Sequence, residues 1–140
     1  MTTATMLPRL RAITAHIDRH ELHQAGSVSI TIHPDNDDIV IGTHHGDDRL
    51  RMAAAWYESF TGAMIFGQSR TVGHTCLHLR TLLEGWDTWM VLNLDGAAAT
   101  VATARFELDA RDEHGWLENQ PVDVAVLRTW AAEGLPAVVA

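Results

Sequence analysis

Residues 76–96 read CLHLRTLLEGWDTWMVLNLDG, and this stretch decides the predicted fold. Apolar and polar side chains alternate in its first half, which is typical of a strand with one buried face. The apolar run 89–94 predicts a second strand, and the segment 84–87 has the composition of a turn. Asp95-Gly96 then signals a two-residue hairpin. The stretch therefore predicts antiparallel strands that follow one another along the chain.

The segments before this stretch predict two helices and a hairpin. Met6, Leu10, Ile13 and Ile17 recur at helical spacing, so they predict one apolar stripe on a helix over about 6–24. The other expected elements here are strands at about 27–33 and 39–41, a turn at 34–38, and a helix at about 48–61.

The segment after it is partly ambiguous. The alanines of 97–108 favour a helix, whereas its threonines and β-branched residues favour a return strand, which we prefer. A last helix is expected over about 121–133, with Pro121 in its first turn. The expected fold is a single α+β domain, 1–140, with element order α-β-β-α-β-β-β-β-α. Its antiparallel sheet has about five to six strands, and the helices pack mainly on one face.

The composition is that of an acidic, histidine-rich globular chain. Arginine supplies all ten basic residues against eighteen acidic ones, and the net charge is −8 with the nine histidines neutral. Binding to nucleic acid or to an anionic membrane surface is disfavoured, because both require clustered positive charge. No apolar run approaches the ~20 residues that span a bilayer. Cys76 is the only cysteine, so we expect no intrachain disulfide and a reducing, cytoplasmic location.

His44, His45, Asp47 and Asp48 form the densest group of candidate metal ligands. Imidazole and carboxylate ligands together suit zinc or a similar divalent transition metal. We nevertheless expect no cofactor, because an aspartate can cap the following helix and the histidines can be surface groups, and the metal site is the alternative. A second histidine group is expected on the solvated flank of the first helix, and its members are His16, His20 and His23.

Motifs for nucleophilic or phosphate chemistry are missing from the sequence. No serine lies in a G-x-S-x-G elbow, and the G-x-x-x-x-G-K-[ST] loop needs the lysine that this chain lacks. Cys76 lies in an alternating strand and is expected to be a small core residue. We therefore predict no catalytic or cofactor-binding residue.

Tryptophan supplies the remaining functional signal. Of five tryptophans, Trp86 and Trp116 fall in predicted turns or loops, and Trp and Arg are enriched where proteins meet. A sheet with a free edge or face can also form a homodimer. We expect a small non-catalytic protein-interaction module of an adaptor, chaperone-like or immunity type, with Trp86 and Trp116 at its interface. The alternative is a metal-binding enzyme or sensor that uses the ligands at 44–48.

Overall fold

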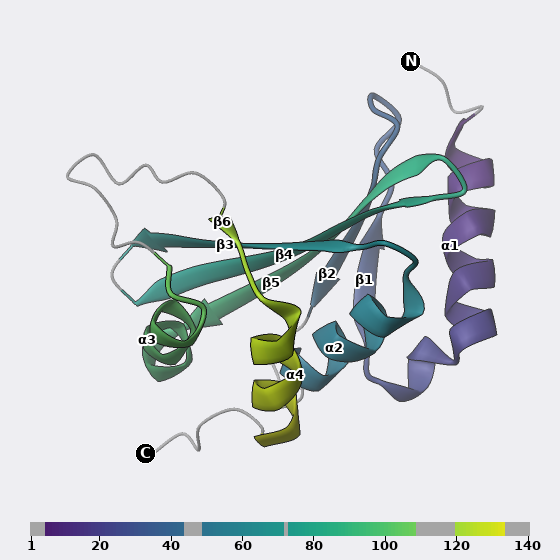
Figure 1. The fold of residues 1–140 in the computed structure, drawn as a ribbon. Helices are drawn as coiled ribbons and strands as arrows, with labels where there is room; N and C mark the ends of the chain where they lie inside the picture. The colour runs from purple at the N-terminus through teal and green to yellow at the C-terminus, as the bar shows by residue number, and fades with distance from the viewer. Residues whose placement is uncertain (1–4, 44–48, 72, 109–119, 134–140) are drawn as a thin grey trace.

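The computed structural model describes residues 5–43, 49–71, 73–108 and 120–133 and has an α+β fold, as predicted (Figure 1). The helices are α1 (Met6–His20), the short 3-10 helix η2 (Leu22–Gln24), α2 (Arg49–Ser59), α3 (Gly96–Arg105) and α4 (Val124–Glu133). The strands are β1 (Val28–Thr31), β2 (Ile39–Thr43), β3 (Met64–Thr71), β4 (His74–Leu83), β5 (Trp86–Asp95) and β6 (Gln120–Pro121).

The six strands form one sheet in the order β1-β2-β5-β4-β3-β6. Four neighbouring pairs are antiparallel, but β2 and β5 are parallel, so the prediction of a purely antiparallel sheet is wrong. The parallel pair arises because the chain crosses from β2 through α2 and lays down β3, β4 and β5 as successive antiparallel neighbours. The last of these then lies beside β2.

The prediction of a return strand over 97–108 is also wrong, because α3 occupies most of this segment. Alanine is the best helix former, and one face of α3 is buried against the sheet. The Thr75 hydroxyl on β4 donates a hydrogen bond to the Ala99 carbonyl, 3.2 Å away. Asp95-Gly96 therefore ends β5 and begins α3, whereas the sequence signal predicted a hairpin at this point.

The β4–β5 hairpin is confirmed and is tighter than the predicted turn. Leu83 pairs with Trp86, so only Glu84 and Gly85 form the loop. Their φ angles of 51° and 86° are those that a two-residue turn of this kind requires. Near the C-terminal end, Pro121 lies in β6 and pairs with β3, so the last helix begins later than expected.

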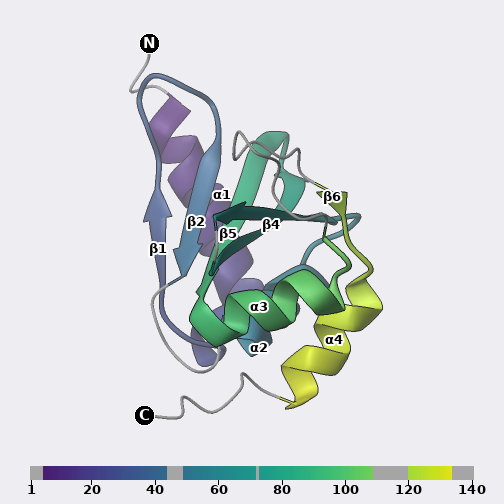
Figure 2. The same cartoon turned by 90° about the vertical axis from the view of Figure 1, so that its left-hand side faces the viewer.

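Alternation along the central strands separates the two faces of the sheet. On β4 and β5, Leu77, Leu79, Met90 and Leu92 are at most 1% exposed and point toward the helices. Figure 1 shows α2, α3 and α4 gathered beneath the sheet, and Figure 2 shows α1 behind β1 and β2. The helices that the structure describes pack on one face, which confirms the prediction.

The buried side of α1 differs from the predicted apolar stripe. Ile13 is buried as expected, but Leu10 is 48% exposed, and Arg9 and His16 are buried in its place. Both polar side chains have hydrogen-bond partners on other elements, which permits their burial.

Candidate interaction surface

The sheet face opposite the helices carries an apolar and charged patch at one end. Leu82 and Met64 are 71% and 56% exposed, and the other two exposed large apolar residues of the described chain, Leu7 and Leu10, lie on α1. Strand register brings the patch together, because Met64 pairs with Arg80, Arg80 with Trp89, and Leu82 with Asp87. We call this group the open-face patch, and its members are Met64, Phe66, Arg80, Leu82, Asp87 and Trp89.

A depression of about 670 Å³ lies within the open-face patch, and we call it the apolar depression. Its walls come from β3, β4, the start of β5 and the loop between α2 and β3. The lining residues are Thr61, Gly62, Met64, Phe66, Arg80, Thr81, Leu82 and Asp87. A concave surface with exposed apolar side chains at its rim is typical of a binding site.

Arg80 and Trp89 form the ordered polar centre of the open-face patch. Arg80 Nε and Nη2 donate to the two carboxylate oxygens of Asp87 at 3.1 and 3.2 Å. The guanidinium carbon lies 4.4 Å from the centre of the Trp89 ring, and Trp89 Nε1 donates to Asp87 Oδ2 at 3.1 Å. A two-pronged ion pair combined with ring stacking restricts both long side chains before any partner binds.

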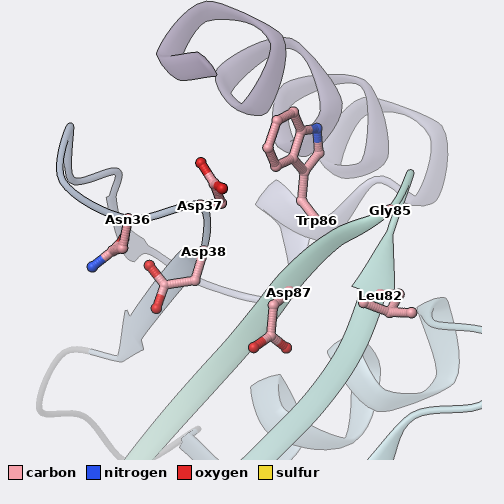
Figure 3. A pocket seen from close by; sticks show the side chains of 7 residues that line it. All are labelled: Asn36, Asp37, Asp38, Leu82, Gly85, Trp86 and Asp87. Atoms are coloured by element: carbon pink, nitrogen blue, oxygen red, sulfur yellow. The ribbon is translucent and has the colours of Figure 1, made fainter. Parts of the chain in front are cut away.

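A second depression, of about 420 Å³, lies across the Leu82–Asp87 pair, and we call it the acidic depression (Figure 3). In Figure 3 the loop before β2 forms one wall, and the start of β5 with the end of β4 forms the other. The lining residues are Asn36, Asp37, Asp38, Leu82, Gly85, Trp86 and Asp87.

Arg9 holds the loop wall of the acidic depression in place. Its side chain is fully buried, and Nη1 and Nη2 donate to the carbonyl oxygens of Asp38 and His33 at 2.7 and 2.8 Å. Its guanidinium carbon also lies 5.9 Å from the centre of the Trp86 ring. Arg9 thus ties α1 to the β1–β2 loop and to β5. The sequence did not identify this residue, because helical periodicity alone does not show that a polar residue is buried.

Of the predicted interface and metal-binding residues, only Trp86 lies within the described part of the chain. Trp86 is half-buried at the start of β5 and lines the acidic depression. Trp116 and the proposed metal ligands lie outside the described residues; these ligands are His44, His45, Asp47 and Asp48. Within the described ranges, no three His, Cys, Asp or Glu side chains are grouped so as to hold a metal ion.

The histidine group on the first helix is divided between core and solvent. His20 and His23 are exposed, as expected, but the prediction that His16 is solvated is wrong because it is 5% exposed. Its ring stacks on Phe60 at 4.9 Å, and its Nε2 lies 2.9 Å from the Ser59 hydroxyl of α2. The burial arises from these contacts between α1 and α2.

Cys76 belongs to a polar group on the same sheet face as the open-face patch. Its Sγ lies 3.5 Å from His74 Nε2, while His74 Nδ1 donates to Asp95 Oδ1 at 2.6 Å. The thiol also donates to Asn93 Oδ1 at 2.8 Å. A thiol, an imidazole and a carboxylate in this order can activate a nucleophile. Cys76 is only 1% exposed, however, so the sulfur is closed to a substrate in this conformation, and its expected burial is confirmed.

The described helices include none that is long and apolar enough to cross a membrane. Comparison of the chain with protein-family models, with curated proteins and with solved structures found no match.

Proposed function

We propose that this protein is a non-catalytic interaction module that binds another protein through the open-face patch. The observation that carries the proposal is the pair of large apolar side chains, Leu82 and Met64, exposed by 71% and 56% at the rim of one depression. Solvent-exposed apolar groups of this size favour association, because a partner removes them from water.

The polar centre of the patch supports the same proposal. Arg and Trp are the residues most enriched among those that dominate binding energy, and Arg80 and Trp89 are already held together. Because their conformation is restricted before binding, association costs less side-chain entropy. The two titratable side chains that line the apolar depression, Arg80 and Asp87, pair with each other.

The burial of Leu82 and Met64 by a partner determines how much these side chains should contribute to the free energy of binding. Complete burial of a leucine or methionine side chain contributes roughly 1.5–3 kcal/mol. Leu82 and Met64 are partly covered already, so each is expected to contribute about 1–2 kcal/mol to partner binding. Truncation of either side chain should therefore weaken binding by about tenfold.

Photo-crosslinking in the native host tests this proposal. The variants Leu82→p-benzoylphenylalanine and Met64→p-benzoylphenylalanine place the reactive group on the patch. Matched controls place it at Ala97 on α3 and Ala132 on α4, which are exposed positions on the helices. We expect a discrete adduct with another protein from the two patch positions and none from the controls.

Three outcomes would overturn the proposal. They are the absence of an adduct at both patch positions, equal adducts at all four positions, and adducts formed only between two copies of this chain. The identity of the crosslinked protein will separate the adaptor, chaperone-like and immunity-type roles, which share this mode of binding. The cytoplasmic location remains part of the proposal, as does a homodimer formed through a free edge of the sheet and not through the open-face patch. The free thiol of Cys76 is consistent with a reducing compartment.

A further inference from the structure

The chemistry of the partner follows from the two depressions, and this inference rests on the function proposed above. We infer that the partner docks with a segment that carries an apolar side chain close to an arginine or lysine. The apolar side chain occupies the apolar depression beside Met64 and Phe66. The basic group occupies the acidic depression beside Asp37 and Asp38.

The two depressions are parts of one continuous surface. Leu82 and Asp87 line both of them, and these two residues are a register pair on β4 and β5. This residue pair therefore forms the boundary between the two depressions. A short peptide segment that crosses this pair reaches the apolar depression on one side and the acidic depression on the other.

The acidic depression holds carboxylates that are available to an incoming cation. Asp87 is already paired with Arg80, but neither Asp37 nor Asp38 forms an ion pair with any residue that the structure describes. Asp37 is exposed, whereas Asp38 is half-buried; its Oδ1 is buried without a hydrogen-bond partner in the described chain, so a cation would approach the other oxygen of this carboxylate. A guanidinium or ammonium group supplies the N–H donors that these carboxylate oxygens can accept.

The basic residues nearby do not neutralise these carboxylates. Within the part of the chain that the structure describes, Arg9 donates to Thr5 and to the backbone carbonyls of His33 and Asp38, and none of these acceptors is a carboxylate. Among the described residues, the surface and the adjoining loop thus hold four carboxylates, against the two guanidiniums of Arg9 and Arg80. The carboxylates are those of Asp35, Asp37, Asp38 and Asp87.

A second copy of this chain is a poorer occupant of the surface than a basic partner. A twofold-symmetric contact brings the same patch of each copy together, so the carboxylates of the two acidic depressions would approach one another. The net charge of −8 adds to that repulsion. Charge complementarity therefore favours a different protein with a basic segment.

Titration with small amides tests the inference on the whole protein by nuclear magnetic resonance. The probe is N-acetyl-arginine amide at millimolar concentration, and N-acetyl-citrulline amide is its uncharged control of nearly the same shape. We expect the arginine probe to shift the amide resonances of residues 36–38 and the Trp86 indole N–H resonance. N-acetyl-leucine amide should instead shift the resonances of Met64 and Phe66.

Charge variants make the test specific to this site. The double variant Asp37→Asn, Asp38→Asn should raise the apparent Kd for the arginine probe by about tenfold. The control double variant Asp18→Asn, Glu107→Gln removes the same amount of negative charge from exposed positions elsewhere. It should leave the apparent Kd for the arginine probe unchanged. Equal shifts with the citrulline probe, no shifts at 36–38, or equal weakening by both double variants would each overturn the inference.

The two proposals can fail separately. Crosslinks from positions 64 and 82 to a segment without a basic residue would leave the interaction function in place and refute the basic partner. Absence of those crosslinks refutes the function itself.

Discussion

Replacement of His16 should remove much of the loss of stability that the protein shows in mild acid. The Ser59 hydroxyl gives its one proton to the Trp56 carbonyl at 2.6 Å, so it accepts a hydrogen bond from His16 Nε2–H at 2.9 Å. When the buried ring is neutral, its proton therefore lies on Nε2. Burial, with smaller effects from the charges of His20 and Arg19, lowers the pKa of His16 from 6.5 to about 4.

The sign of the effect follows from the direction of this shift. Because the pKa is lower in the folded state, the unfolded chain binds an extra proton at pH values between 6.5 and about 4. The free energy of unfolding is therefore highest above pH 6.5 and decreases as the pH falls toward about 4. At about 1.4 kcal/mol per pKa unit the limit is about 3 kcal/mol, and solvent at the edge of the site reduces the expected loss to about 2 kcal/mol.

Urea unfolding followed by tryptophan fluorescence, at roughly pH 7 and pH 4.5, measures this loss. His16→Gln lowers stability at neutral pH through lost packing, but its further loss in acid should be about 2 kcal/mol smaller than that of the wild type. The control is His23→Gln, at an exposed position, which should keep the wild-type dependence. An unchanged acid loss in His16→Gln, or titration of the His16 ring near pH 6.5 by nuclear magnetic resonance, would refute the reasoning.

Three further predictions concern the structure that supports the surface. Arg9→Met removes the donors to two backbone carbonyls, those of His33 and Asp38, in hydrogen bonds that are partly buried. It should lower the free energy of unfolding by about 3 kcal/mol in urea unfolding. Arg11→Met at an exposed position should change it by less than about 0.5 kcal/mol, and equal effects would contradict the role of Arg9. Gly67→Ala brings a methyl group within 2.8 Å of Leu108 Cδ2 and should cost about 1–3 kcal/mol in the same assay, so an unchanged unfolding midpoint would show that this contact relaxes freely. Cys76 should react with a disulfide reagent far more slowly in the native protein than in urea, and equal rates would show that the thiol is open.

Local patterns predicted most of the helices and strands, but they did not predict every pair of neighbouring strands. The alternation in 76–83 and the apolar run in 89–94 identified β4 and β5, because a half-buried strand repeats every two residues. The contact between β2 and β5 joins strands that are far apart in sequence, and no local pattern encodes it. For 97–108, intrinsic propensities conflicted, and packing of α3 against β4 and β5 decided the outcome.

The candidate surface was predictable only in part for the same reason. Trp86 was identified by its residue type and its place at a turn. The acidic depression forms only where the loop at 36–38 lies against the β4–β5 hairpin. These segments are far apart in sequence, so no local pattern predicts their contact. Arg9 and His16 are buried because their partners come from distant elements, so the periodicity of α1 misplaced its buried side.

Binding of the crosslinked partner to the Leu82→Asp variant most directly tests the claim that the sheet face opposite the described helices is the docking surface. Leu82 is 71% exposed, so the change should alter the free energy of unfolding by less than about 0.5 kcal/mol. A charge beneath the docked partner should nevertheless raise the Kd at least about tenfold, as measured by calorimetry with the purified partner. An unchanged Kd for a stably folded Leu82→Asp variant would contradict the account.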